Sequence, residues 1–183
     1  MTLLWVGWAS FLAVFAGGHW RTRRDRGGGP ARENRVLRDR SSDLGMALQT
    51  VGLAIAFAGG EPRSNLLPYA LAVAASAILF TGWALRWLGR QWRIAAVVTD
   101  DHELITGGPY AVVRHPIYLG LLGMLGATLL VHTAFFLIAP SLLIYLAGTQ
   151  IRVRAEDKIL AAAFRGRFSR YKARVRAYIP LPR

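Results

Sequence analysis

Long apolar runs separated by arginine-rich blocks are the feature that most restricts how this chain of 183 residues can fold. Residues 66–88 form the clearest run, and its length suits a helix that crosses a hydrocarbon layer of about 30 Å. Further apolar runs occupy residues 3–20, 44–60, 117–131 and 134–151. We therefore predict an all-α integral membrane helical bundle with five transmembrane helices, in a single membrane domain covering residues 1–183.

The basic residues are distributed unevenly between the connecting segments. If all five runs cross the membrane, residues 21–43, 86–115 and 152–183 lie on one face and hold every Lys and Arg except Arg63. The positive-inside rule then places that face and the C-terminus in the cytoplasm and the N-terminus outside, and we expect the plasma (inner) membrane. The net charge of +13 should meet anionic lipid headgroups rather than nucleic acid, because the arginine-rich loop 21–43 lacks interleaved aromatic side chains.

The connection between the last two apolar runs and the segment from Arg152 onward are predicted from the length of the connection and from the periodicity of apolar residues. Only His132 and Thr133 separate the last two runs, which indicates an antiparallel helical hairpin. From Arg152 onward, apolar residues recur near helical spacing while Arg or Lys fill other positions, which predicts an amphipathic C-terminal helix on the cytoplasmic face. The apolar positions are Ile159, Leu160, Ala163, Phe164 and Phe168.

Residues 107–120 combine glycines and prolines with Arg, His and two Tyr just ahead of an apolar run. Ionisable groups at membrane depth are costly and usually face a cavity or a ligand. Gly107-Gly108 permits φ > 0 and close approach of the backbone to a ligand, although a connecting turn explains the pair equally well. Pro116 suits the first turn of the next helix, whose free N–H groups favour a carboxylate. Taken singly, Arg114 and His115 are more often interfacial side chains than ligand contacts.

A second polar group follows the last apolar run. Arg152 and Glu156 are four residues apart, so one helix face carries both, and Glu156-Asp157 places two acids in a basic region. The group is either a helix salt bridge or a carboxylate held near a cationic ligand. The chain has no Cys, which excludes thiolate chemistry, and its four His show no i,i+4 pair, so we predict no metal site.

Taken in order, these pieces resemble the isoprenylcysteine carboxyl methyltransferase and phospholipid methyltransferase superfamily. The resemblance covers roughly residues 89–183 and rests most on Arg114-His115-Pro116-x-Tyr118, followed after a hairpin by Glu156-Asp157. The family usually has two Glu where this chain has Glu156-Asp157. The family also tends to have Phe-Gly followed by Tyr, whereas this chain has Phe164-Arg165-Gly166, in which the glycine is shifted along the sequence. The other matching pieces are Gly89-Arg90-Gln91-Trp92, His102-x-Leu104, Gly108-Pro109-Tyr110 and Ile179-Pro180.

The resemblance implies an integral membrane methyltransferase that uses S-adenosylmethionine and acts on a lipophilic acceptor, either prenyl-carboxylate-like or phospholipid-like. It implies that residues 89–183 supply the cofactor-binding loop, the hairpin and the C-terminal helix. The three N-terminal spans in residues 1–88 are predicted from their apolar runs and resemble the family only in being membrane helices. The candidate catalytic residues are Glu156 and Arg152. The candidate cofactor-binding residues are Gln91, His102, Leu104, Gly108, Tyr110, Arg114, His115, Pro116, Tyr118 and Glu156.

The chemistry of this cofactor fits these residue types. Glu156 would complement its positive charge, Arg114 or the N–H groups ahead of the helix would hold its carboxylate, and Leu104 with Tyr110 would enclose its adenine. Arg152 would orient an acceptor carboxylate, and Glu156 would take a proton from an acceptor amine. Two other functions stay open, namely a membrane reductase of related fold that uses NADPH and a non-enzymatic membrane scaffold whose basic loops bind anionic lipid.

Overall fold

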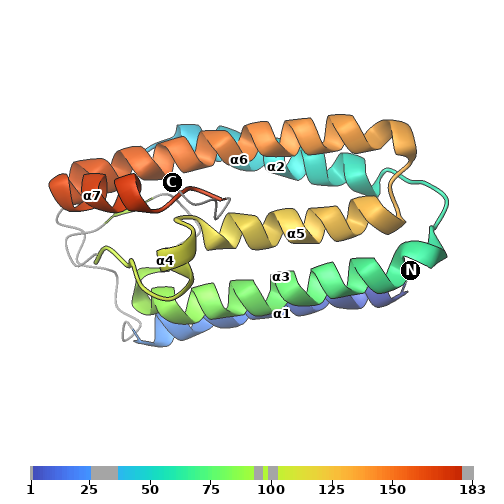
Figure 1. The fold of residues 1–183 in the computed structure, drawn as a ribbon, viewed down its shortest axis with the longest axis horizontal. Coiled ribbons are helices and arrows are strands. Elements are labelled where there is room, and N and C mark those ends of the chain that lie inside the picture. Colours follow the sequence, from blue (N-terminus) through green and yellow to red (C-terminus); the bar gives the residue numbers. More distant parts are fainter. Residues whose placement is uncertain (1, 26–36, 93–96, 99–102, 179–183) are drawn as a thin grey trace.

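The computed structural model describes residues 2–25, 37–92, 97–98 and 103–178 (Figure 1). These residues fold into long helices joined by short elements. The long helices are α1 (Thr2–Asp25), α2 (Ser41–Phe57), α3 (Leu67–Leu88), α5 (Pro116–Val131) and α6 (Phe135–Phe164). The short elements are η1 (Ser64–Leu66), η2 (Gly89–Gln91), α4 (Pro109–Val112), α7 (Gly166–Arg174) and an antiparallel pair, β1 (Leu37–Arg38) with β2 (Val97–Val98).

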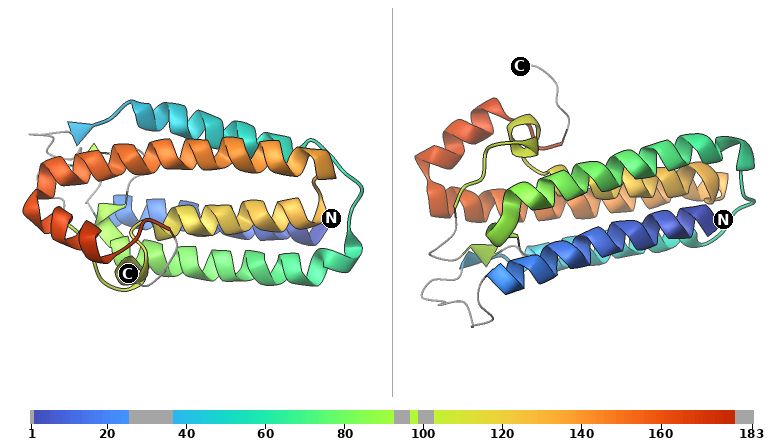
Figure 2. Two further views of the ribbon diagram at one scale, coloured as in Figure 1. Left: turned by 45° about the horizontal axis from the view of Figure 1, so that its top comes forward. Right: turned by 90° about the horizontal axis from the view of Figure 1, so that it is seen from below.

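The long helices run side by side along one axis, so the prediction of a helical bundle is confirmed (Figure 1, Figure 2). α2 packs along α6, α3 packs along α5, and α1 packs chiefly against α3. α4 and α7 lie at one end of the bundle, which we call the α7 end. Residues 58–66 and 132–134, which link α2 to α3 and α5 to α6, lie at the opposite end, which we call the far end.

Three helical segments among the described residues are long and apolar enough to cross a membrane, namely Thr2–Thr22, Ser64–Leu88 and Phe135–Phe164. α5 is an apolar helix of 16 residues, and α2 has 17 residues. By length and composition the chain is therefore a membrane protein with three candidate spans. The five predicted crossings correspond in position to the five long helices.

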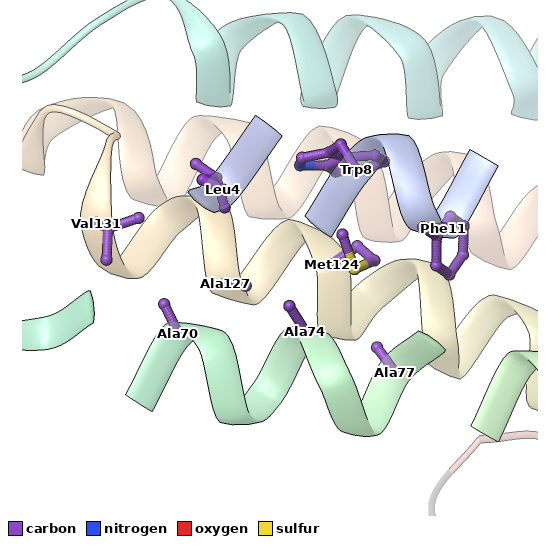
Figure 3. Packing of buried hydrophobic residues seen from close by; sticks show 9 residues of the cluster. All are labelled: Leu4, Trp8, Phe11, Ala70, Ala74, Ala77, Met124, Ala127 and Val131. Atoms are coloured by element: carbon purple, nitrogen blue, oxygen red, sulfur yellow. The ribbon is translucent and has the colours of Figure 1, made fainter. Parts of the chain in front are cut away.

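Small side chains bring α1, α3 and α5 close together at the centre of the bundle. Alanines of α3 form one wall of this cluster, and larger side chains of α1 and α5 fill the space opposite them (Figure 3). The buried indole Nε1 of Trp8 donates a hydrogen bond to Thr128 Oγ1 at 3.0 Å, which satisfies the polar atom of that side chain. The cluster contains Leu4, Trp8, Phe11, Ala70, Ala74, Ala77, Met124, Ala127 and Val131.

The contact between α2 and α6 depends on glycine. A Cβ atom at Gly148 would lie 2.5 Å from the carbonyl oxygen of Gly45, and a Cβ atom at Gly45 would lie 2.6 Å from Cγ of Arg152. Because protein interiors are close-packed, a side chain at either position would push the two helices apart. The close approach places Gln49 of α2 beside Arg152 and Thr149 of α6.

Arg63, the basic residue that the charge pattern places on the opposite face, caps a helix. Its Nε donates to the carbonyl of Leu130 at 2.7 Å, and its Nη2 donates to the carbonyl of Leu129, at the C-terminal end of α5. The guanidinium therefore satisfies carbonyls that the helix leaves without partners, and its charge complements the negative end of the helix dipole.

The helix predicted to begin at Arg152 does not begin there. α6 continues without a break through Phe164, because residues 152–163 contain neither Gly nor Pro and are rich in Ala. The chain turns at Arg165, whose φ of 44° is positive although it is not a glycine. α7 then packs beside the end of α6 and buries Phe168 and Tyr171. The predicted C-terminal helix is thus divided between α6 and α7.

Candidate functional site

Two parts of the chain that are distant in sequence meet at the α7 end. Arg114 and His115 lie just before α5, and Glu156 and Asp157 lie near the end of α6. His115 Nδ1 is 3.2 Å from Glu156 Oε2, and His115 Nε2 is 3.2 Å from Asp157 Oδ1. Arg114, His115 and Glu156, which the family resemblance assigns to one cofactor site, therefore lie close together. We call Arg114, His115, Tyr118, Glu156 and Asp157 the carboxylate cluster.

His115 links the two acids of this cluster. Its side chain is buried, and burial by itself disfavours the charged imidazolium. The hydrogen bonds and charges of Asp157 and Glu156 outweigh burial, so the pKa of His115 is raised above its usual value of 6.5. With both ring nitrogens facing carboxylates, the protonated ring donates two hydrogen bonds.

Asp157 pairs with more basic groups than Glu156 does. Arg114 Nη2 lies 2.9 Å from Asp157 Oδ2, and Lys172 Nζ of α7 lies 2.9 Å from the same oxygen. The shorter acid at the place of the family's usual second Glu therefore joins α6 to α7 and to the segment before α5. Lys172 is absent from the predicted site residues, because it reaches Asp157 only through the turn at Arg165.

Glu156 and Arg152, the two candidate catalytic residues, meet through Tyr118. The Tyr118 hydroxyl donates to Glu156 Oε1, and the Arg152 guanidinium lies 5.2 Å from the centroid of the Tyr118 ring. Arg152 Nη1 also donates to Gln49 Oε1 at 3.4 Å, and Gln49 Nε2 donates to Thr149 Oγ1 at 2.9 Å. Arg152 is only 8% exposed, so an aromatic ring and an amide hold a cation inside the protein.

The segment Val175–Tyr178, which follows α7, covers the carboxylate cluster. The N–H groups of Arg114 and His115 donate to the carbonyls of Arg176 and Ala177 at 2.8 and 3.0 Å. Arg114 Nη1 donates to the Val175 carbonyl at 2.6 Å. The Tyr178 ring centroid lies 6.4 Å from that of His115. The chain after α7 is thereby fixed to the segment before α5.

Tyr110 and the glycines before it lie beside the cluster. The Tyr110 carbonyl accepts a hydrogen bond from the Tyr171 hydroxyl at 2.6 Å, whereas the buried Tyr110 hydroxyl has no hydrogen-bond partner among the described residues. Gly108 has φ 58°, a conformation that favours glycine. A Cβ atom at Gly107 would lie 2.7 Å from Cζ3 of Trp87. The close approach that the glycines allow is therefore to a tryptophan of α3.

The remaining predicted positions are spread more widely. Pro116 is buried in the first turn of α5, as predicted. Leu104 lines a pocket beside α7, and Gln91 ends η2, which contacts α1 and α3. Within the described part of the chain, no hydrogen bond or ion pair joins Gln91 or Leu104 to the carboxylate cluster. His102, Ile179 and Pro180 lie outside the described residues.

These observations define the class as a helical membrane protein that brings two acids, a histidine and arginines together at one end of its bundle. The model of the isoprenylcysteine carboxyl methyltransferase (ICMT) family matches residues 69–162, more than half of the chain, and the chain belongs to this family. The match runs from α3 to the end of α6 and so includes the whole carboxylate cluster. It leaves out Gln49 of α2 and Lys172 of α7.

Curated relatives match parts of the chain. The cobalt-zinc-cadmium resistance protein CzcN of Cupriavidus metallidurans is 33% identical over 110 residues, which is 54% of this chain and 46% of that protein. The protein-S-isoprenylcysteine O-methyltransferase of Schizosaccharomyces pombe is 33% identical over 89 residues, 48% of this chain and 37% of that protein. The uncharacterised protein YpbQ of Bacillus subtilis is 31% identical over 100 residues, 55% of this chain and 59% of that protein. The chain thus matches less than two thirds of the length of each of these relatives.

Proposed function

We propose that this protein is an S-adenosylmethionine-dependent membrane methyltransferase whose acceptor is lipophilic, either prenyl-carboxylate-like or phospholipid-like. The observation that carries the proposal is the contact of His115 and Tyr118 with Glu156 at the α7 end. Buried ionisable groups from separate helices are costly, and they occur most often where a ligand or a reaction needs them. Membership of the ICMT family supports methyl transfer as the class of reaction.

The side chains present fit the cofactor. Arg114 Nε and the Tyr110 hydroxyl are buried without hydrogen-bond partners among the described residues, and such atoms lower stability unless a ligand completes them. Arg114 would hold the ligand's carboxylate, Glu156 would lie near its positive charge, and Tyr110 with Leu104 would enclose the adenine. The other positions assigned to the cofactor pocket are Gln91, His102, Gly108, His115, Pro116 and Tyr118.

Bound S-adenosylmethionine supplies an electrophilic methyl group, and the residues of this chain position the acceptor. Arg152, held by Gln49 and the Tyr118 ring, orients an acceptor carboxylate, which is nucleophilic once it is ionised. With an amine acceptor, Glu156 instead accepts the proton that the nitrogen loses. Positioning accounts for much of the acceleration, because the displacement at carbon depends on alignment of the reacting atoms.

We also propose that the chain forms one domain and crosses the plasma (inner) membrane five times. α5 and α2 lie alongside the three longer helices. They have 16 and 17 residues, which at a rise of about 1.5 Å per residue makes them about 24 and 26 Å long. Tyr69 and Trp87, near the two ends of α3, are 67% and 50% exposed, as aromatic side chains at the two membrane surfaces would be. They lie about 27 Å apart along the helix, close to the hydrocarbon thickness of about 30 Å. The α7 end is then cytoplasmic, α7 lies on that face, and the N-terminus is outside.

Binding of S-adenosylhomocysteine to the detergent-solubilised protein tests the cofactor. The wild type is expected to bind saturably. Glu156→Gln is expected to weaken binding about 10-fold or more, because a contact with a charged group contributes about 1.5–3 kcal/mol. Glu61→Gln makes the same change at an exposed residue of the far end and is expected to bind like the wild type.

Methyl transfer is then measured with a radiolabelled methyl donor over membrane lipids and prenylated carboxylates. Wild type and Glu61→Gln are expected to label an extractable lipid product, and Glu156→Gln is not. Folded wild type that binds NADPH but not S-adenosylhomocysteine at millimolar concentration would replace the proposal with a reductase. Equal labelling by Glu156→Gln would remove this acid from the reacting site.

A further inference from the structure

A pocket of about 510 Å³ lies between the loop before α4, α4 itself and α7. α4 and α7 are neighbours at the same end of the bundle in both orientations (Figure 1, Figure 2). The pocket lining includes Arg167, Arg170 and Arg174 of α7, together with Tyr171 and the loop residues Leu104 and Thr106. Within the described part of the chain, neither Asp nor Glu lines it. The pocket is therefore cationic on the α7 side and partly apolar inside.

The basic residues of α7 lie on two different sides of this helix. Lys172 faces the carboxylate cluster and pairs with Asp157. Arg167, Arg170 and Arg174 follow one another at three- and four-residue spacing, so they share a different face, and each is exposed. None of the three has an acidic partner among the described residues. Like charges at this spacing repel one another and destabilise a helix, so the fold itself gains nothing from the grouping.

The three arginine side chains are chemically suited to a ligand that carries a phosphate group. Guanidinium groups bind phosphate oxygens through paired, charge-assisted hydrogen bonds. The pocket volume falls in the range of about 300–1,000 Å³ found for small-molecule sites, which suits a headgroup better than a bare ion. Val175 and the ring of Tyr171 offer apolar contacts to the carbon atoms of such a ligand.

The position of the pocket favours a lipid as the source of the phosphate. α4, which forms part of the wall, follows Gly107, and Gly107 packs against the half-exposed Trp87 at the end of α3. Tryptophan at the end of an apolar helix is typical of the headgroup level of a membrane. We propose that the pocket binds the phosphodiester headgroup of an anionic phospholipid such as phosphatidylglycerol. This site goes beyond the proposed methyl transfer and does not depend on it.

Native mass spectrometry of the full chain in neutral detergent tests the proposal with short-chain phosphatidylglycerol, short-chain phosphatidylcholine and inorganic phosphate. The wild type is expected to prefer phosphatidylglycerol. Arg167→Gln/Arg170→Gln/Arg174→Gln is expected to lose about 10-fold or more in affinity for it. The control variant removes the same charge from exposed arginines that do not line the pocket and is expected to retain wild-type affinity. Its substitutions are Arg40→Gln, Arg86→Gln and Arg154→Gln.

The control separates a site from general attraction. Equal losses in both triple variants would overturn the proposal, because total charge alone would then explain binding. Equal affinity for phosphatidylcholine would overturn it as well, and so would displacement of the lipid by an equal concentration of phosphate. If the triple variant unfolds, Arg170→Gln alone is expected to lose about 3-fold, and an unchanged affinity in that variant would likewise count against the site.

Discussion

The two ends of the bundle both hold charged side chains, but these side chains have different partners at each end. At the far end, Arg63 donates to carbonyls at the end of α5, so one cation completes one helix. At the α7 end, His115 and Arg114 meet the acids Glu156 and Asp157, so charges from separate parts of the chain pair with one another. Capping a helix requires one side chain, whereas the α7 end assembles two acids with several bases. The difference places the candidate chemistry at the α7 end.

Replacing Asp157 is expected to have the largest effect on stability. Asp157→Asn leaves His115, Arg114 and Lys172 facing an uncharged amide, and breaking a buried ion pair from one side costs about 3 kcal/mol or more. We expect a correspondingly lower midpoint of thermal unfolding in detergent. Asp39→Asn is the matched control, because Asp39 pairs with the exposed Lys158 and should change the midpoint far less. Similar losses in both variants would mean that the buried cluster adds no more than a surface pair.

The pH dependence of unfolding is expected to come from the α7 end alone. Because the pKa of His115 is raised in the folded protein, its contribution to stability is complete below pH 6.5 and is lost as the pH rises through that raised pKa. The effect is smaller than that of Asp157→Asn, since Arg114 and Lys172 still pair with Asp157 when the ring is neutral.

Thermal unfolding measured from pH 6 upward checks this sign. The midpoint of the wild type should fall with rising pH, and His115→Gln should flatten the profile in the same window. Arg63→Gln should keep the wild-type profile, because a guanidinium stays charged throughout. A wild-type midpoint that rises with pH, or a profile that His115→Gln leaves unchanged, would assign the titration to another group.

At the far end, Arg63→Gln is expected to cost about 1.5–2 kcal/mol, through the loss of charge-assisted hydrogen bonds to the end of α5. S-adenosylhomocysteine affinity should stay at the wild-type value, because the cap lies at the opposite end from the carboxylate cluster. The paired measurement is the unfolding midpoint and ligand affinity of one preparation. A variant that keeps its midpoint but loses affinity would contradict the separation of the two ends.

The sequence predicted most of the bundle because apolar runs and Gly or Pro breaks are local signals. The end of α6 was predicted wrongly, since the expected boundary at Arg152 marks where charge begins rather than where the helix stops. The true turn at Arg165 carries no local signal of its own, because Arg rarely adopts positive φ. Only the shifted glycine of Phe164-Arg165-Gly166 pointed to an irregularity there.

The site residues that belong to a sequence motif could be predicted. The site residues that only helix packing brings to the site could not. The meeting of His115 and Tyr118 with Glu156 follows from the resemblance to the family. Gln49 and Lys172 could not be found in that way, because Gln49 is placed by the close approach of α2 and α6, and Lys172 by the turn before α7. Such contacts depend on helix spacing and chain reversal, which no single residue pattern records.

The smallest predicted effect tests the strain that the α7 end carries. Arg165→Gly is expected to raise stability by about 1 kcal/mol, because glycine adopts φ 44° without the steric cost that a side chain incurs there. Arg165→Ala removes the same charge but keeps a Cβ atom, and it should leave the unfolding midpoint at the wild-type value. If both variants stabilise equally, relief of repulsion among the arginines near α7 explains the gain. If only the glycine variant does, the turn that brings Lys172 to Asp157 is held under backbone strain, for which the far end has no counterpart at a non-glycine residue among those described.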